Sequence, residues 1–215
     1  MKHWLSYLGP IRLKTVDSSL HNDLHIALDS GKKVLHSGNV NYSYGPLQHI
    51  LEEGLRRILT NSSPKSILLL GLAAGSVIQS LREKFYVSAP ITAVEIDPLM
   101  VEIAQTEFQI GRFPNVFIHI NSAENYVGQS IQPFDLIIVD VFYHQTIPTT
   151  CLETSFFDSL LKRCNPGGTI LFNTFRETLS AQHRKSMIDF FLNNQTKLTI
   201  LENVGSTNDL FLIQL

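Results

Sequence analysis

Apolar residues follow two different periods along the chain, and the change between them divides the sequence. In the first 45 residues, Leu24–Leu28 and Lys33–His36 flank the turn sequence Asp29-Ser30-Gly31-Lys32, which predicts a β-hairpin. Asn39–Ser43 either extends the second strand or begins a third. Between Pro46 and Leu59, apolar residues recur every three or four positions, which predicts a helix. We therefore expect a hairpin subdomain at residues 1–45 and a main domain at 46–215.

From Ser66 onward, apolar runs of strand length alternate with segments of helical period. The predicted strands are 67–70, 91–96, 116–120, 136–139 and 169–173, and the predicted helices are 77–85, 98–108, 153–164 and 180–194. Residues 197–202 and 209–214 read as an antiparallel pair around Gly205. This order predicts an α/β, Rossmann-like fold with a mostly parallel seven-stranded sheet, an antiparallel C-terminal strand and helices on both faces.

Composition narrows the classes of function. The chain has 215 residues, 44% of them hydrophobic, which is enough for one large domain with a full core. A net charge of −2 and the lack of a basic run give no electrostatic reason to expect nucleic acid or a membrane surface. No apolar run is long enough to cross a bilayer, and the first residues lack a signal-peptide pattern. Two cysteines favour a reducing cytoplasm and give no reason to expect a metal.

The segment from Ser66 to Gly75 contains the clearest motif. A buried strand breaks into Gly71-Leu72-Ala73-Ala74-Gly75, whose small residues allow a sharp turn and the close approach of a ligand to the main chain. Glu95 ends the next strand, where its carboxylate can accept both hydroxyls of a ribose. The spacing lacks the third glycine of a dinucleotide fingerprint and the Gly-Lys-Ser/Thr ending of a P-loop. It resembles the loop of S-adenosylmethionine-dependent enzymes.

Polar residues follow four of the predicted strands. Ligands of such sheets bind at the carboxyl ends of the strands, near the point where the strand order reverses. We therefore expect these residues to lie together in one site: the 71–75 loop, Glu95, the group Asn121, Ser122 and Glu124, and the group Asp140, Tyr143 and His144.

Longer motifs resemble the spermidine synthase family of polyamine aminopropyltransferases and their methyltransferase-like relatives. They are Val94–Asp97, the run Phe134–Asp140, and the segment from Leu152 to the Asn165-Pro166-Gly167-Gly168 turn, and the N-terminal hairpin also fits. The resemblance covers about nine tenths of the chain. It implies a class I methyltransferase fold, a small β-domain that helps to cover the active site, a small-molecule substrate and a homodimer.

The resemblance also assigns site residues. The residues expected to bind S-adenosylmethionine, or its decarboxylated form, are Gly71, Ala73, Gly75, Glu95, Ile96, Asn121, Ser122 and Asp140. The residues expected to act in catalysis are Asp140 and Tyr143. Those expected to bind the substrate are Asn41, Tyr44, Gln48 and His144.

Three departures from the family pattern affect the expected reaction. Ala74 stands where the glycine loop has an acid, Ser122 replaces the acid that reads the adenine amino group, and Tyr143 replaces the second of two carboxylates after the fourth strand. Aminopropyl transfer needs acids both to hold a cationic diamine and to take its proton. Methyl transfer depends mainly on alignment of the nucleophile with the sulfonium. The leading hypothesis is therefore a methyltransferase with an unidentified acceptor.

Two alternatives stay open. Aminopropyl transfer is favoured by the lack of Arg or Lys near the four strand ends, since decarboxylated S-adenosylmethionine has no carboxylate to pair with a cation. A non-catalytic nucleoside-binding or scaffold protein is favoured by the altered glycine loop and by Ser122.

Overall fold

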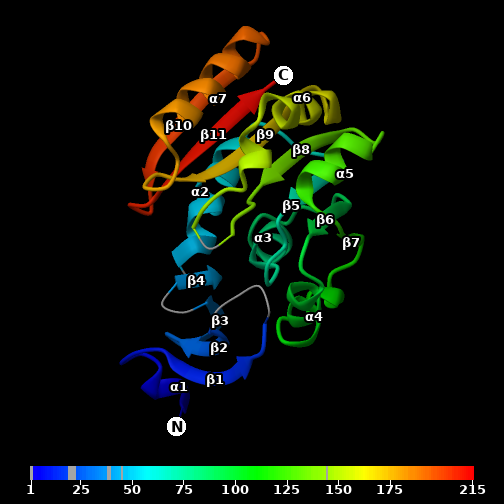
Figure 1. Cartoon of the computed structure of the whole chain (residues 1–215). Coiled ribbons are helices and arrows are strands. Elements are labelled where there is room, and N and C mark those ends of the chain that lie inside the picture. Colours follow the sequence, from blue (N-terminus) through cyan, green and yellow to red (C-terminus); the bar gives the residue numbers. More distant parts are fainter. Residues whose placement is uncertain (1, 19–22, 38–39, 45, 144) are drawn as a thin grey trace.

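The computed structural model of this protein describes residues 2–18, 23–37, 40–44, 46–143 and 145–215. Two sheets occupy opposite ends of the molecule, with the smaller one at the N-terminal end (Figure 1). Helix α2 (Pro46–Leu59) follows the small sheet and leads into the large one.

The small sheet has four antiparallel strands in the order β1-β2-β3-β4. They are β1 (Ile11–Val16), β2 (Leu24–Asp29), β3 (Lys32–Ser37) and β4 (Val40–Ser43), and a short helix, α1 (Lys2–Leu5), precedes them. The predicted hairpin is β2–β3, with Ala27 opposite Val34. The segment after it forms a strand of its own. Strand β1 was not predicted; its middle four residues are exposed.

The large sheet has seven strands in the order β10-β11-β9-β8-β5-β6-β7. Strands β7, β6, β5, β8 and β9 run parallel, while β11 is antiparallel to both β9 and β10. The predicted fold and C-terminal pair are confirmed. The strands are β5 (Ile67–Leu70), β6 (Ile91–Glu95), β7 (Val116–Ile120), β8 (Phe134–Val139), β9 (Cys164–Phe175), β10 (Lys197–Val204) and β11 (Asn208–Gln214).

Helices cover both faces of this sheet, and successive residues of each central strand face opposite layers. In β5, Ile67 and Leu69 join one apolar cluster, while Leu68 and Leu70 join the other. The first cluster includes α2, α3 (Ser76–Gln79) and α4 (Pro98–Thr106). The second includes α5 (Ala123–Gln129), α6 (Thr154–Arg163) and α7 (Ala181–Asn193). Burial on both faces explains why these strands read as continuous apolar runs.

Three helical features differ from the prediction. The helix expected at 77–85 is split into α3 and a π-helical turn, η1 (Ser80–Lys84). Helix α5 was not predicted because its seven residues bury only Ala123 and Val127. Short 3-10 turns, η2 (Ile110–Arg112) and η3 (Thr149–Leu152), lie in segments predicted as loops.

The small sheet shares one apolar cluster with helices of the large domain and makes polar contacts to α3 and to the end of α4. Lys14 and Lys33 donate from Nζ to the two carboxylate oxygens of Glu107, at 2.7 and 3.3 Å. Ser43 donates to Ser76 across the same boundary at 3.1 Å. The division into domains at residue 45 remains a prediction. Across the described ranges, no helix has the length and apolar character needed to span a bilayer.

Candidate active site

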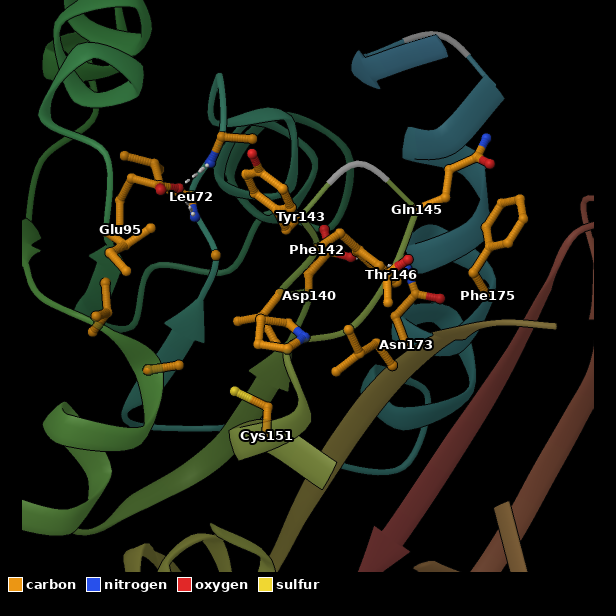
Figure 2. Close-up of a pocket in the computed structure, with 18 of the residues that line it drawn as sticks. Leu72, Glu95, Asp140, Phe142, Tyr143, Gln145, Thr146, Cys151, Asn173 and Phe175 are labelled. Carbon is orange, nitrogen blue, oxygen red and sulfur yellow. Dashed lines mark hydrogen bonds between the residues drawn. The ribbon is translucent and has the colours of Figure 1, made fainter. Parts of the chain in front are cut away.

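A cavity of about 930 Å³ opens at the carboxyl ends of β5, β6, β8 and β9. This is the point where the strand order reverses, since β6 lies on one side of β5 and β8 on the other. Figure 2 shows Glu95 and Leu72 on one side of the cavity, Asn173, Gln145 and Phe175 on the other, and Asp140 and Tyr143 between them. We call these two sides the adenosyl end and the reacting end, after the roles that we propose for them below.

Backbone geometry shapes the adenosyl end. Gly71 has φ +91°, and a Cβ there would lie 2.2 Å from the carbonyl oxygen of Asp140. Gly75 has φ +86°, and a Cβ there would lie 2.4 Å from the side chain of Ile110. Both positions therefore require glycine. Gly71 and Ala73 line the cavity, whereas Gly75 packs behind the loop and is not part of its lining.

Glu95 ties the loop to the end of β6. Its Oε2 accepts hydrogen bonds from the backbone N–H groups of Leu72 (3.1 Å) and Ala73 (2.9 Å), and its Oε1 accepts from Asp97 N–H at 3.0 Å. Burial raises the pKa of Glu95, and these hydrogen bonds oppose that rise. A carboxylate has about four acceptor positions. The three backbone donors leave about one of these positions for a ligand hydroxyl.

The residues that follow β6 and β7 complete the adenosyl end. Ile96 is 64% exposed and lines the cavity. Asn121 and Ser122 line it as well, and the Ser122 hydroxyl caps α5 by accepting from Asn125 N–H at 3.3 Å. Glu124 also faces the cavity, and its carboxylate accepts a 3.3 Å hydrogen bond from the hydroxyl of Thr150.

Asp140 follows β8 and lies between the two ends. Its Oδ1 accepts a 2.8 Å hydrogen bond from Nδ2 of Asn173. Burial raises the pKa of Asp140 to about 6; the Asn173 hydrogen bond opposes this rise, and the negative charge of Glu95 adds to it. The pKa of Asp140 thus lies closer to neutral pH than that of an exposed aspartate.

Asn173 and Asn208 belong to the reacting end but were not predicted from sequence. Both are buried and line the cavity, and Asn208 donates from Nδ2 to the Oδ1 of Asn173 at 2.9 Å. Thr207 in turn donates from its hydroxyl to the Oδ1 of Asn208 at 2.6 Å. The available signal was an asparagine inside an otherwise apolar strand, since buried amides require partners.

The loop after β8 gives the reacting end an aromatic wall. Tyr143 is 52% exposed and pairs with Thr146 through two backbone hydrogen bonds, of 2.9 and 3.0 Å. Phe142 and Phe175 line the same region. His144, a predicted substrate residue, lies outside the described residues.

Two of the other predicted substrate residues, Tyr44 and Gln48, do not line the cavity. Tyr44 is buried, stacks on Phe108 and donates from its hydroxyl to the carbonyl of Ala74 at 3.2 Å, so it supports the glycine loop from behind. Gln48 donates to the hydroxyl of Ser80 at 2.7 Å. Asn41 lies in β4, and its side chain is outside the described part of the structure. Roles in substrate binding remain predictions for these residues.

Acidic residues dominate the charge of the cavity. Four carboxylates line it: Glu95, Asp97, Glu124 and Asp140. Among the described lining residues there is no lysine, arginine or histidine. The field therefore favours a cationic ligand.

Comparison with known proteins places the chain in a family. Residues 61–208 match the family described as "Methyltransferase domain". A polyamine aminopropyltransferase of Vibrio vulnificus (strain CMCP6) is 30% identical over 135 residues, which cover 61% of this chain and 45% of that protein. The chain thus spans about half the length of this curated relative.

Solved structures agree with this placement in fold. A "probable spermidine synthase" of Corynebacterium glutamicum superposes with a TM-score of 0.76 at 20% identity, covering 94% of this chain and 79% of that one. Human methyltransferase-like protein 13, solved with SAH, has a TM-score of 0.62 at 22% identity, covering 80% and 83%.

The chain belongs to the methyltransferase-domain family, and its resemblance to spermidine synthases is confirmed. The family model and the Vibrio vulnificus relative are thus named for two kinds of group transfer, methyl and aminopropyl.

Proposed function

We propose that this protein transfers the methyl group of S-adenosylmethionine to an acceptor held at the reacting end of the cavity. The observation that supports methyl transfer most directly is the lone carboxylate of the reacting end. Asp140 is present, while Tyr143 occupies the place of the second acid in the spermidine synthase pattern. A single acid suits a reaction that depends mainly on alignment.

The described residues fit this cofactor. A volume of about 930 Å³ suits a nucleoside with a charged tail and a neighbouring acceptor. Glu95 would accept from a ribose hydroxyl, the 71–75 loop would pack against the nucleoside, and Asn121 and Ser122 would face the adenine. When bound, S-adenosylmethionine supplies a methyl carbon activated by a sulfonium. The acidic lining complements both the sulfonium and the ammonium of that molecule.

Asp140 and Tyr143 would act on the acceptor side. In its ionised form, Asp140 can accept a hydrogen bond from an ammonium or hydroxyl and can take a proton from the acceptor. The Tyr143 hydroxyl can orient a nucleophile by donating to it or accepting from it. The aromatic side chains of Phe142 and Phe175 would exclude water from the reacting atoms.

Aminopropyl transfer is the second candidate, and one observation favours it. The described lining residues offer four carboxylates but no cation to pair with the carboxylate of S-adenosylmethionine. Decarboxylated S-adenosylmethionine has no such group, and its ammonium suits an acidic wall.

Calorimetric titration with S-adenosylhomocysteine and with methylthioadenosine separates the two candidates. These are the products of methyl and aminopropyl transfer, and they differ only in the tail on sulfur. Tighter binding of S-adenosylhomocysteine supports the proposal. Tighter binding of methylthioadenosine would reject it in favour of aminopropyl transfer, and binding of neither would reject both.

A further inference from the structure

Three polar side chains behind Asp140, two of them buried, form a series of hydrogen bonds that neither sequence motif nor family resemblance assigns. We propose that Asn173 and Asn208 are positioning residues that hold the Asp140 carboxylate in one orientation at the reacting end, with Thr207 anchoring the series. This inference deepens the proposed function and rests on its assignment of Asp140 to the acceptor side.

The strand order brings these residues together. Val139 lies beside Phe172 in the parallel β8–β9 pair, so Asp140 follows directly beside Asn173. Asn208 lies opposite Phe175 in the antiparallel β9–β11 pair, which makes it a diagonal neighbour of Asn173. The chain of contacts therefore crosses three adjacent strands at their cavity ends.

Donor and acceptor can be assigned in only one way along this series of side-chain hydrogen bonds. An ionised carboxylate only accepts hydrogen bonds, so Asn173 must turn its Nδ2 toward Asp140, at 2.8 Å. Its Oδ1 then faces Asn208, which donates from Nδ2 at 2.9 Å. The remaining Oδ1 of Asn208 accepts from the Thr207 hydroxyl at 2.6 Å. Each amide is thus fixed in one of its two possible orientations.

This arrangement acts on one carboxylate oxygen. The Asn173 amide engages Oδ1 of Asp140, which leaves Oδ2 as the oxygen assigned to the ligand. A hydrogen bond donated to a carboxylate also favours its ionised form, so Asn173 counteracts the effect of burial on the pKa of Asp140.

Packing alone does not explain two amides at these positions. Asn173 and Asn208 are 5% and 2% exposed, and the residue before Asn173, Phe172, is a fully buried hydrocarbon. A buried amide is costly unless its hydrogen bonds are made. An apolar side chain would fill the same space without that cost. We therefore attribute the two amides to the hydrogen bond that the Asp140 carboxylate requires.

The experiment is a pH titration of the Asp140 side-chain carboxyl by NMR in ¹³C-aspartate-labelled full-length protein, with the Asp140→Asn variant used to assign the signal. In Asn173→Ala we expect the midpoint to rise by about one pH unit, because the donor to the charged form is lost. Asn208→Ala should cause a smaller rise, and it should add nothing when Asn173 is already alanine, because its effect passes through that residue.

Strand β8, which leads into Asp140, and strand β9, which contains Asn173, also supply a matched control. At their opposite end, Asn165 donates from Nδ2 to Oδ1 of Asp135 at 2.7 Å, an equivalent pair remote from the cavity lining. Asn165→Ala should raise the midpoint of Asp135 and leave that of Asp140 in place. A general loosening of the sheet would instead move both midpoints in every variant.

Two results would overturn the inference: an Asp140 midpoint that stays within about 0.2 pH units in folded Asn173→Ala, or effects of Asn173→Ala and Asn208→Ala that simply add. Titration of the wild type with S-adenosylhomocysteine and methylthioadenosine tests the proposed function independently of the NMR experiment. Binding of neither rejects the proposed function, whereas the NMR midpoints still decide whether the amide chain controls Asp140.

Discussion

The two ends of the cavity are built in different ways. The adenosyl end is made of backbone: a loop with two glycines at positive φ, held by N–H groups that donate to Glu95. The reacting end is made of side chains: Asp140, Asn173 and Asn208 come from three strands, and Tyr143 comes from a loop. A nucleoside that is common to a whole class of enzymes needs a fixed shape, whereas an acceptor needs specific chemistry.

This difference predicts how each end responds to change. Substitutions at the adenosyl end should act on folding and on nucleoside affinity, because the backbone itself forms the binding surface. Substitutions at the reacting end should act on protonation and rate while nucleoside affinity is kept. The following variants test that separation, beginning with the largest expected effect.

Gly71→Ala should have the largest effect. The added Cβ would lie 2.2 Å from the Asp140 carbonyl oxygen at φ +91°, so the two ends would be forced apart. We expect a loss of about 3–5 kcal/mol in the free energy of unfolding, measured by urea denaturation. Gly128→Ala is the control: no atom lies within 4 Å of its Cβ, and in helix α5 it should stabilise by up to about 1 kcal/mol. Equal effects of the two variants would contradict the assignment of a close approach at Gly71.

Glu95→Gln should weaken binding of S-adenosylhomocysteine by about 100- to 1000-fold, because hydrogen bonds to a charged group contribute about 1.5–3 kcal/mol each. Calorimetry measures the affinity, and circular dichroism confirms folding. Glu53→Gln, an exposed change on α2, should bind as the wild type does. An affinity kept within about threefold in Glu95→Gln would remove Glu95 from the nucleoside site.

Asp140→Asn should stabilise the fold at neutral pH. Because the pKa of Asp140 is raised from 3.8 to about 6, the charged carboxylate lowers the stability of the wild type above pH 6 by up to about 3 kcal/mol. This penalty declines as the pH falls through 6 and vanishes below 3.8. The gain in Asp140→Asn should therefore be about half as large at pH 5 as at pH 7.

Urea unfolding at several pH values measures this difference, and Asp158→Asn, a half-exposed change on α6, is the control. A gain that does not depend on pH would show that the substitution acts through packing instead of charge. Transfer activity should fall in Asp140→Asn while S-adenosylhomocysteine affinity stays within about tenfold, in contrast with Glu95→Gln.

Cys151→Ala should have the smallest effect. The thiol lies in the cavity wall, and burial together with the charge of Glu124 raises its pKa to about 12, so it is not a nucleophile at neutral pH. We expect S-adenosylhomocysteine affinity within about twofold of wild type and a loss of about 1 kcal/mol in stability. A thiol reagent at pH 8 should modify neither Cys151 nor the buried Cys164 until the protein unfolds. Rapid native modification of Cys151 would refute this.

Part of the architecture could be predicted because its signal is local. The boundaries of β5, β7 and α2 match the predicted ones. Strand β5 is an apolar run buried on both faces, β7 is a mostly apolar run at the sheet edge, and α2 has helical spacing of its apolar residues. Strand β1 and helix α5 were missed because they bury few residues and are held by their neighbours. Tyr44 was assigned to the substrate from its position in the chain, while the structure places it behind the glycine loop.

The sequence by itself determined the adenosyl end, because a strand, a tight turn and an acid at the end of the next strand follow one another along the chain. Only the tertiary structure decided which side chains support Asp140 at the reacting end. Asp140, Asn173 and Asn208 are separated by 33 and 35 residues, and they meet because β9 lies between β8 and β11. The order of the strands is determined by the packing of the whole sheet. A local sequence pattern therefore does not predict which buried amide lies beside which carboxylate.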